Sequence, residues 1–182
     1  DPGSPSQELV EFLTSRKLNL RYIINTHGHI DHIRGNDFFK DYFSSVKIII
    51  YETDMAYLNH PNLNLSTDFS QPYRSPEPDI LIRGKKEPFE LFDEEVYFYH
   101  SPGHTPGSMC LSFPNQKWLF CGDTLFAGSI GRTDLPGGSF QEILESLTMI
   151  MQSFDDETRV FPGHGPETVS YTHMTLPTNY PV

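Results

Sequence analysis

The sequence is poor in cysteine, in basic residues and in long apolar runs, and each shortage excludes a class of protein. Cys110 and Cys121 are the only cysteines, so no framework of disulfide bonds is available, and we expect both to be reduced thiols packed in the core. No apolar run approaches the roughly 20 residues that a membrane-spanning helix needs, and there is no signal-peptide pattern. Lysine and arginine number 13 against 24 aspartates and glutamates, and the formal charge of −11 disfavours nucleic acid or an anionic membrane as a partner. These shortages predict a soluble protein of the cytoplasm.

A chain of 182 residues is long enough for one domain with a sizeable core. We expect that domain to span residues 1–168. Residues 169–182 change character abruptly, and Val169-Ser-Tyr-Thr-His173 resembles the translation of a sequencing-library adapter. We therefore treat residues 169–182 as a non-native tail and exclude them, His173 included, from functional reasoning.

Local patterns predict a mixed α/β chain. Apolar residues at helical spacing predict helices within residues 4–17, 35–43, 52–58 and 139–154. Runs rich in β-branched and aromatic residues predict strands at residues 20–25, 46–51, 89–91, 96–99, 108–113, 117–120 and 159–161. A helix between the first two strands predicts parallel pairing there, and the strands from residue 89 onward predict an antiparallel meander. Residues 59–88 are polar and rich in proline, which predicts a substrate-facing loop or a lid.

The most informative stretch is Thr26-His27-Gly28-His29-Ile30-Asp31-His32, which directly follows the first predicted strand. A turn at Gly28 can direct His27 and His29 to the same point, and Asp31 and His32 fall on the first turn of a following helix. A lone His-x-His on a surface is usually a chance pair. With Asp31 and His32 added, the cluster predicts two adjacent metal positions at the end of a buried strand.

Three later turns each follow a predicted strand and each carry one further metal-ligating side chain: His104, Asp123 and His164. Glycine or proline beside each of them lets the backbone turn sharply. If these strand ends share an edge, seven ligands converge. Neutral imidazoles with carboxylate oxygens suit zinc best, with iron or manganese as alternatives.

These motifs resemble those of the metallo-β-lactamase superfamily. The similarity lies in Thr26–His32, in Gly103-His104-Thr105-Pro106-Gly107, in Gly122-Asp123-Thr124 and in Gly163-His164-Gly165. The segment 122–138 is similar to the compact glyoxalase II-like enzymes, the hydroxyacylglutathione hydrolases. The resemblance implies an αββα sandwich of the α/β (α+β) class, with the first strands of the N-terminal sheet missing from this chain.

The resemblance also implies a ligand set for two divalent metal ions. The first ion would be held by His27, His29 and His104, the second by Asp31, His32 and His164, and Asp123 would be shared by both. A hydroxide between the ions would attack the carbonyl of a thioester, with Asp31 and Asp123 holding it in place. Thr105 and Ser108 would support the ligand loops, and Arg132 with Asp134 would either form a bracing ion pair or meet an anionic substrate.

The expected substrate is a small-molecule thioester, such as a glutathione conjugate. The alternative is a sulfur dioxygenase that oxidises glutathione persulfide at a single iron, and a third possibility is a metal-binding protein without turnover. His60 is expected to be exposed and His100 to pack beside the ligand loop. The sequence gives no indication of the oligomeric state.

Overall fold

The structure is a computed structural model that describes residues 1–69 and 71–169, and it divides into two compact units. The first unit is Asp1–Arg83 and the second is Gly84–Val182. No helix in the described residues is both long and apolar enough to span a membrane.

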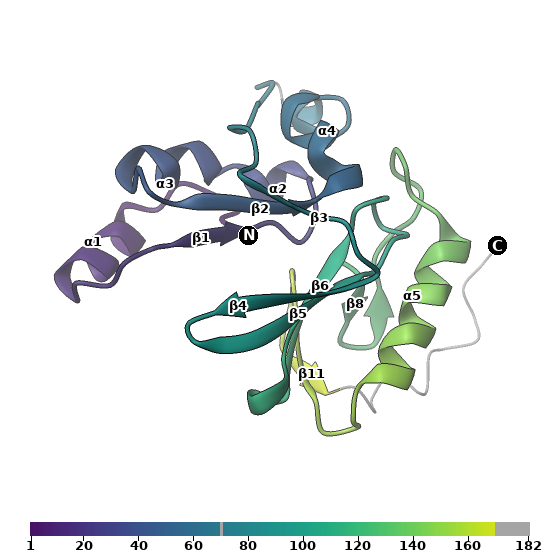
Figure 1. Cartoon of the computed structure of the whole chain (residues 1–182). Coiled ribbons are helices and arrows are strands. Elements are labelled where there is room, and N and C mark those ends of the chain that lie inside the picture. The colour runs from purple at the N-terminus through teal and green to yellow at the C-terminus, as the bar shows by residue number, and fades with distance from the viewer. Residues whose placement is uncertain (70, 170–182) are drawn as a thin grey trace. The chain divides into compact units, whose positions relative to one another are not determined.

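The first unit is a three-stranded parallel sheet, in the order β1-β2-β3, with short helices packed against it (Figure 1). In chain order its elements are α1 (Gln7–Ser15), β1 (Tyr22–Ile24), α2 (Ile30–Ile33), α3 (Asn36–Tyr42), β2 (Lys47–Tyr51), the 3-10 helix η1 (Glu52–Asp54), α4 (Met55–Asn59), the 3-10 helix η2 (Ser66–Phe69) and β3 (Ile80–Ile82). Val10 of α1 and Phe39 of α3 pack with Ile23 and Ile48 of the sheet. The expected parallel pairing of the first two strands is confirmed.

The second unit is a six-stranded sheet in the order β11-β10-β7-β6-β5-β4, with one long helix on it. Its elements are β4 (Lys86–Leu91), β5 (Glu94–His100), β6 (Met109–Phe113), the 3-10 helix η3 (Pro114–Gln116), β7 (Trp118–Gly122), β8 (Leu125–Phe126), β9 (Ser129–Ile130), α5 (Phe140–Ser153), β10 (Arg159–Pro162) and β11 (Thr168–Val169). Strands β4 to β7 form the expected antiparallel meander, and β10 joins β7 in parallel. Because β5 and β7 run the same way, the strands β5, β7 and β10 all end at the same edge of this sheet.

The prediction of a substrate-facing loop or a lid over residues 59–88 was wrong for the last part of this segment. Strand β3 lies inside it, paired with β2 through Ile49–Ile80 and Tyr51–Ile82, and Ile82 is buried. Strand β4 also begins within it, three residues before the expected start, and contains Pro88. Proline is tolerated there because β4 is the edge strand of its sheet.

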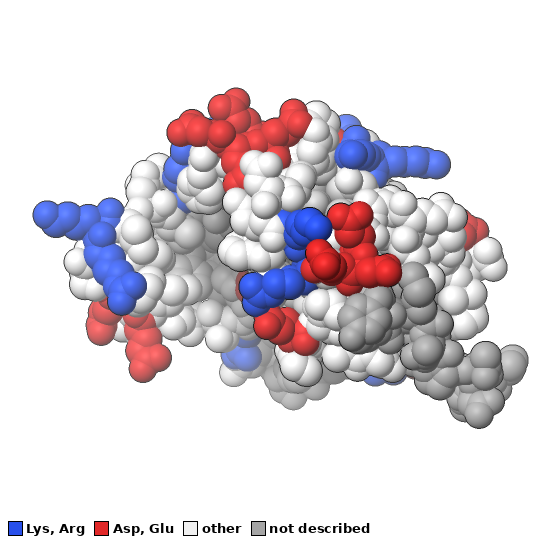
Figure 2. Space-filling model, turned by 90° about the horizontal axis from the view of Figure 1, so that it is seen from below, with Lys and Arg blue, Asp and Glu red and all other residues white. Residues whose placement is uncertain are grey.

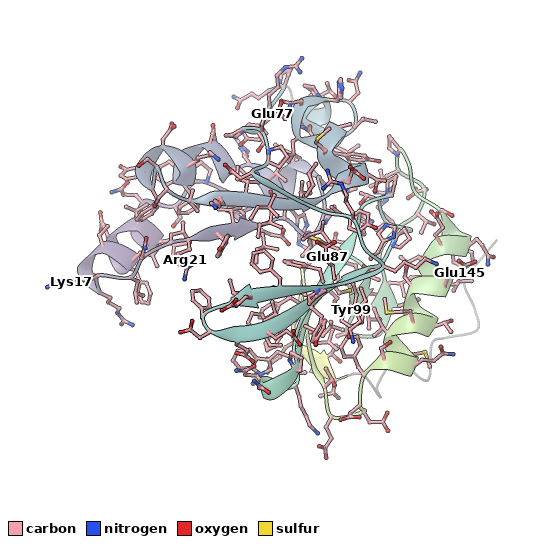
Figure 3. The ribbon with its side chains drawn as sticks, viewed as in Figure 1. Lys17, Arg21, Glu77, Glu87, Tyr99 and Glu145 are labelled. Atoms are coloured by element: carbon pink, nitrogen blue, oxygen red, sulfur yellow. The ribbon has the colours of Figure 1, made fainter. Side chains whose placement is uncertain are left out.

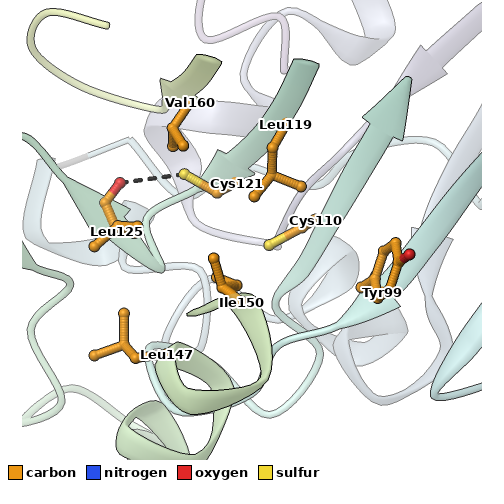
Figure 4. Close-up of a cluster of buried hydrophobic side chains, with 8 residues drawn as sticks. All are labelled: Tyr99, Cys110, Leu119, Cys121, Leu125, Leu147, Ile150 and Val160. Carbon is orange, nitrogen blue, oxygen red and sulfur yellow. Dashed lines mark hydrogen bonds between the residues drawn. The ribbon is translucent and has the colours of Figure 1, made fainter. Parts of the chain in front are cut away.

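Helix α5 packs against the second sheet through a cluster of buried side chains (Figure 4). Leu147 and Ile150 of α5 contact the sheet residues, which include Cys110 on β6 and Cys121 on β7. The apolar residues of α5 do not all face the sheet, because Leu144 and Met151 are exposed by 38% and 43% while Ser146 is buried. Ser146 is accommodated because its hydroxyl donates to the carbonyl of Pro102 at 2.7 Å.

The two cysteines are free and buried, as expected. Burial raises the pKa of Cys110 from 9.0 to about 11, and burial likewise raises the pKa of Cys121. A thiol whose pKa is raised on folding stabilises the fold below its unfolded pKa, and that contribution is lost as the pH rises from 9 towards 11.

We expect both thiols to react with a thiol-specific disulfide reagent at pH 8 about 100-fold more slowly in the native protein than in denaturant, because the thiolate is the reactive form. Absorbance of the released reagent measures the rate. Fast reaction of both thiols in the folded protein would contradict the buried placement.

Charged side chains of both signs lie on the face shown in Figure 2, where the acidic ones gather in separate groups. Some charged side chains of the protein form ion pairs. Arg83 Nε lies 2.8 Å from Glu52 Oε1, and Arg159 Nη2 lies 2.6 Å from Glu167 Oε2. These pairs are largely exposed, so each contributes little to stability.

Candidate metal centre

The histidine cluster of the first unit lies on the loop that leaves β1 and enters α2. The ring centroids of His27 and His29 are 4.8 Å apart, and those of His27 and His32 are 4.0 Å apart. All three side chains are almost fully buried, at 1%, 3% and 2% exposure. Three buried imidazoles this close together offer several nitrogen donors at one place, which suits a metal ion.

Asp1 fixes one of these rings, although the sequence interpretation did not single it out. Its carboxylate accepts hydrogen bonds from the backbone N–H and the hydroxyl of Thr26, both at 2.7 Å, and lies 3.1 Å from His32 Nδ1. A carboxylate only accepts, so Nδ1 carries the hydrogen and the neutral ring has its lone pair on Nε2. This carboxylate–histidine arrangement is typical of metal ligands.

Asp54 is a second residue that the sequence interpretation missed. It is fully buried at the end of η1, and its Oδ2 accepts the backbone N–H of Gly28 at 2.9 Å. Tyr57 packs over the same turn, since a Cβ on Gly28 would lie only 2.3 Å from the Cβ of Tyr57. Burial and the neighbouring Asp54 charge raise the pKa of Tyr57 to about 12. Asp54 and Tyr57 therefore fix the turn between His27 and His29.

Asp31 lies on the first turn of α2, as expected, with Oδ2 3.9 Å from Nε2 of His32. Its side chain is 52% exposed, in contrast to the buried histidines. Its carboxylate is therefore the most solvent-exposed candidate metal ligand of this loop.

In the second unit the structure brings His104, Asp123 and His164 together. Each follows one of the strands β5, β7 and β10, which end at the same edge of the sheet. Asp123 Oδ2 lies 3.6 Å from His104 Nε2 and 3.7 Å from His164 Nε2. These distances are longer than a hydrogen bond. They are close to the roughly 3.3–3.6 Å that separates two ligand atoms around a tetrahedral metal ion with metal–ligand bonds of about 2.0–2.2 Å.

The tautomer of His104 is fixed in the same way as that of His32. His104 Nδ1 donates to the backbone carbonyl of Arg132 at 2.8 Å, so the lone pair of the neutral ring is on Nε2, which faces Asp123.

The residue beside Arg132 is Gly131. A Cβ there would lie 1.8 Å from the carbonyl oxygen of Asp123 and 3.3 Å from the Cβ of His104, so only glycine fits.

Buried hydroxyl groups make hydrogen-bond contacts within the His104 loop and between it and the Asp123 loop. The hydroxyls of Thr105 and Ser108 lie 2.8 Å apart, and Ser108 also accepts the backbone N–H of Thr105 at 3.1 Å. Ser101, at the start of the His104 loop, lies 3.0 Å from the hydroxyl of Thr124, which follows Asp123. The link between Ser101 and Thr124 connects the two ligand loops, and the sequence interpretation did not include it.

The remaining candidates have ordinary roles in the structure. Arg132 pairs with Asp134 through two contacts of 2.7 Å, and this guanidinium lowers the pKa of Asp134 to about 2. His60 is exposed, as expected. His100 Nε2 lies 2.8 Å from the carbonyl oxygen of Pro106, where it braces the His104 loop. His173, which we excluded, lies outside the described residues.

Residues 1–164 match the family model of the metallo-β-lactamase superfamily. The chain is 32% identical to a "probable metallo-hydrolase" of Streptococcus pyogenes serotype M6, with 92% of this chain and 74% of that protein covered. It is 31% identical to the hydroxyacylglutathione hydrolase GloC of Haemophilus influenzae, with 94% and 79% covered. The crystal structure of the BLEG-1 B3 metallo-β-lactamase matches with a TM-score of 0.89 at 32% identity, over 96% of this chain and 83% of that one. With its histidine and aspartate motifs inside the matched region, the chain belongs to the metallo-β-lactamase superfamily.

Proposed function

We propose that the histidines and aspartates of the two units together hold two divalent metal ions, and that the protein is a thioester hydrolase. Family membership supports metal binding, because proteins of this superfamily bind divalent metals. The donor chemistry in each unit supports it independently. His32 and His104 each present Nε2 in the ligand form, and Asp123 lies at ligand–ligand distance from two imidazoles.

The proposed ligand set follows the motif positions. The first ion takes His27, His29 and His104, and the second takes Asp31, His32 and His164, with Asp123 shared between them. Zinc is the proposed metal, because all donors are imidazole nitrogens and carboxylate oxygens and no cysteine is among them.

Two bound divalent cations would supply a water activated at neutral pH and polarisation of a substrate carbonyl. The protein's own residues supply orientation. Asp123 is positioned between two imidazoles, so its carboxylate can accept a hydrogen bond from the attacking water and orient it while the ring tautomers stay fixed. The side chain of Asp31 is half exposed, and its carboxylate can also accept a hydrogen bond from this water. Thr105 and Ser108 keep the His104 loop from shifting as charge develops.

We propose a small thioester of the hydroxyacylglutathione type as the substrate. The GloC relative named above supports this choice, and the match to it covers 94% of this chain. Because Arg132 is already paired with Asp134, we assign it a bracing role on the loop that holds His104 rather than direct substrate binding. A glutathione thioester and two reduced thiols both fit a reducing compartment, so we propose that the protein acts in the cytoplasm.

Metal content and turnover of S-lactoylglutathione, measured on the same zinc-reconstituted sample, test this function. We expect about two zinc ions per chain and thioester cleavage that a chelator abolishes and added zinc restores. In the protein as isolated, without added zinc, a single iron per chain with oxygen uptake on glutathione persulfide would replace the hydrolase with a dioxygenase. Two bound zinc ions with no thioester cleavage would leave a metal-binding protein of another function.

A further inference from the structure

A hollow of about 310 Å³ lies in the second unit, beside the C-terminal end of α5. Lys117 and Thr158 line it, and they directly precede β7 and β10. Asp123 and His164 follow the other ends of those two strands. Among the described residues that line the hollow, none is a proposed metal ligand.

Aromatic rings form much of the wall of this hollow. Tyr97 and Tyr99 come from β5, Trp118 begins β7, and Phe154 directly follows α5. Tyr99 and Phe154 pack edge to face, with ring centroids 5.1 Å apart. Figure 4 shows Tyr99 at the margin of the buried cluster, with its hydroxyl directed away from Cys110 and Ile150, and Figure 3 shows it on the ribbon. Rings arranged in this way offer flat apolar surface to a planar ligand.

A buried hydroxyl also lines the hollow. Ser112 on β6 is only 4% exposed, and it stands opposite Tyr97 in the sheet register. This hydroxyl can donate a hydrogen bond to an acceptor on a ligand in the hollow.

Two lysines line the hollow, and their surroundings differ. Lys117 Nζ lies 3.5 Å from Asp155 and 3.3 Å from Glu157, so its charge is balanced locally. Lys86 Nζ lies over the rings of Tyr97 and Tyr99, at 4.3 and 5.2 Å from their centroids. Within the described residues, no carboxylate is recorded within ion-pair distance of Lys86. Its ammonium is therefore the cation in this hollow that is available to an anion.

We propose that this hollow binds a small aromatic carboxylate, with the ring between the aromatic side chains and the carboxylate on Lys86. Its volume is at the lower end of the range for small-molecule sites, which fits a molecule of one or two rings. The aromatic walls select a planar apolar body, and the Lys86 ammonium and the Ser112 hydroxyl select an anionic end that accepts hydrogen bonds. The proposal does not depend on the function of the metal centre.

Trp118 makes the test specific, because it is the single tryptophan of the chain and it lines the hollow. Its fluorescence is recorded while the full-length protein is titrated with benzoate. We expect a saturable change, with benzyl alcohol, acetate and benzylamine binding at least about tenfold more weakly, since each lacks either the ring or the negative charge. No saturable change with benzoate, or tighter binding of benzylamine, would overturn the proposal.

Two controls establish whether benzoate binds in this hollow and on Lys86. Lys86→Gln is expected to weaken benzoate binding about tenfold, whereas Lys85→Gln, which removes the neighbouring exposed ammonium that does not line the hollow, leaves it unchanged. Equal effects of the two variants would overturn the assignment to Lys86. The titration is repeated after metal chelation, and we expect the same curve. Loss of the signal on chelation would place the carboxylate on a bound metal and overturn the proposal.

Discussion

The Asp123→Asn variant is expected to lose thioester turnover by more than about 100-fold and to bind fewer than two zinc ions per chain. An amide at this position removes the negative charge that stands between His104 and His164, at 3.6 and 3.7 Å from their Nε2 atoms. Loss of a supporting partner of a ligand already costs about 10- to 100-fold in metal affinity or activity, and loss of a ligand shared by two ions costs more. Zinc content by elemental analysis and turnover of S-lactoylglutathione measure the two effects.

Asp156→Asn is the matched control for this variant. It makes the same chemical change at an exposed turn residue of the same unit, and we expect wild-type metal content and turnover. If Asp123→Asn retained both metals and full activity, the shared-ligand role of Asp123 would be wrong. If metal content fell equally in both variants, the loss would come from the change in net charge and not from a ligand role of Asp123.

The Gly131→Ala variant is expected to lower the free energy of unfolding by about 3 kcal/mol, as overpacking of a tight site does. The added Cβ would overlap the backbone carbonyl of Asp123, at 1.8 Å, and press on His104. Either the loop carrying Asp123 or the loop carrying His104 must move, so metal affinity should fall together with stability. Urea unfolding and zinc titration test both effects.

Gly128→Ala separates the steric overlap from backbone strain. Gly128 lies three residues earlier at φ +77°, and a Cβ there would meet no atom within 4 Å. Its substitution should cost only about 1 kcal/mol, because alanine tolerates a left-handed conformation poorly. If Gly131→Ala cost no more than Gly128→Ala, the close packing of Gly131 against Asp123 would be refuted.

Most of the helices and strands follow from local patterns, and the main error shows where such patterns fail. Residues 80–82 are a short apolar run beyond a proline-rich segment, and only pairing with β2 makes them a strand. The helix faces show the same limit. Leu9 and Phe12 of α1 have helical spacing, yet they are 43% and 44% exposed, because the sheet beneath this helix accepts mainly Val10. Tertiary contacts decided both outcomes, and local sequence does not contain them.

The candidate metal ligands could be predicted from sequence because four of them cluster within residues 27–32, and the other three stand in turns after strands with glycine beside them. Asp1 and Asp54 could not be identified in this way. They act on Thr26, Gly28 and His32 across separations of 25 to 31 residues, and only the fold brings them to these partners. The Asp1-Pro2-Gly3 turn was a visible signal, but its carboxylate has no local feature that marks it as the partner of His32.

The central claim is that donors from the two units bind the same pair of cations. Anomalous diffraction from crystals of the zinc-loaded protein tests it most directly. We expect two zinc peaks about 3.5–4 Å apart, with His27, His29 or His32 and also His104, Asp123 or His164 at about 2.0–2.2 Å from the metals. Zinc ions coordinated by donors of one unit alone, or bound at separate places, would contradict it.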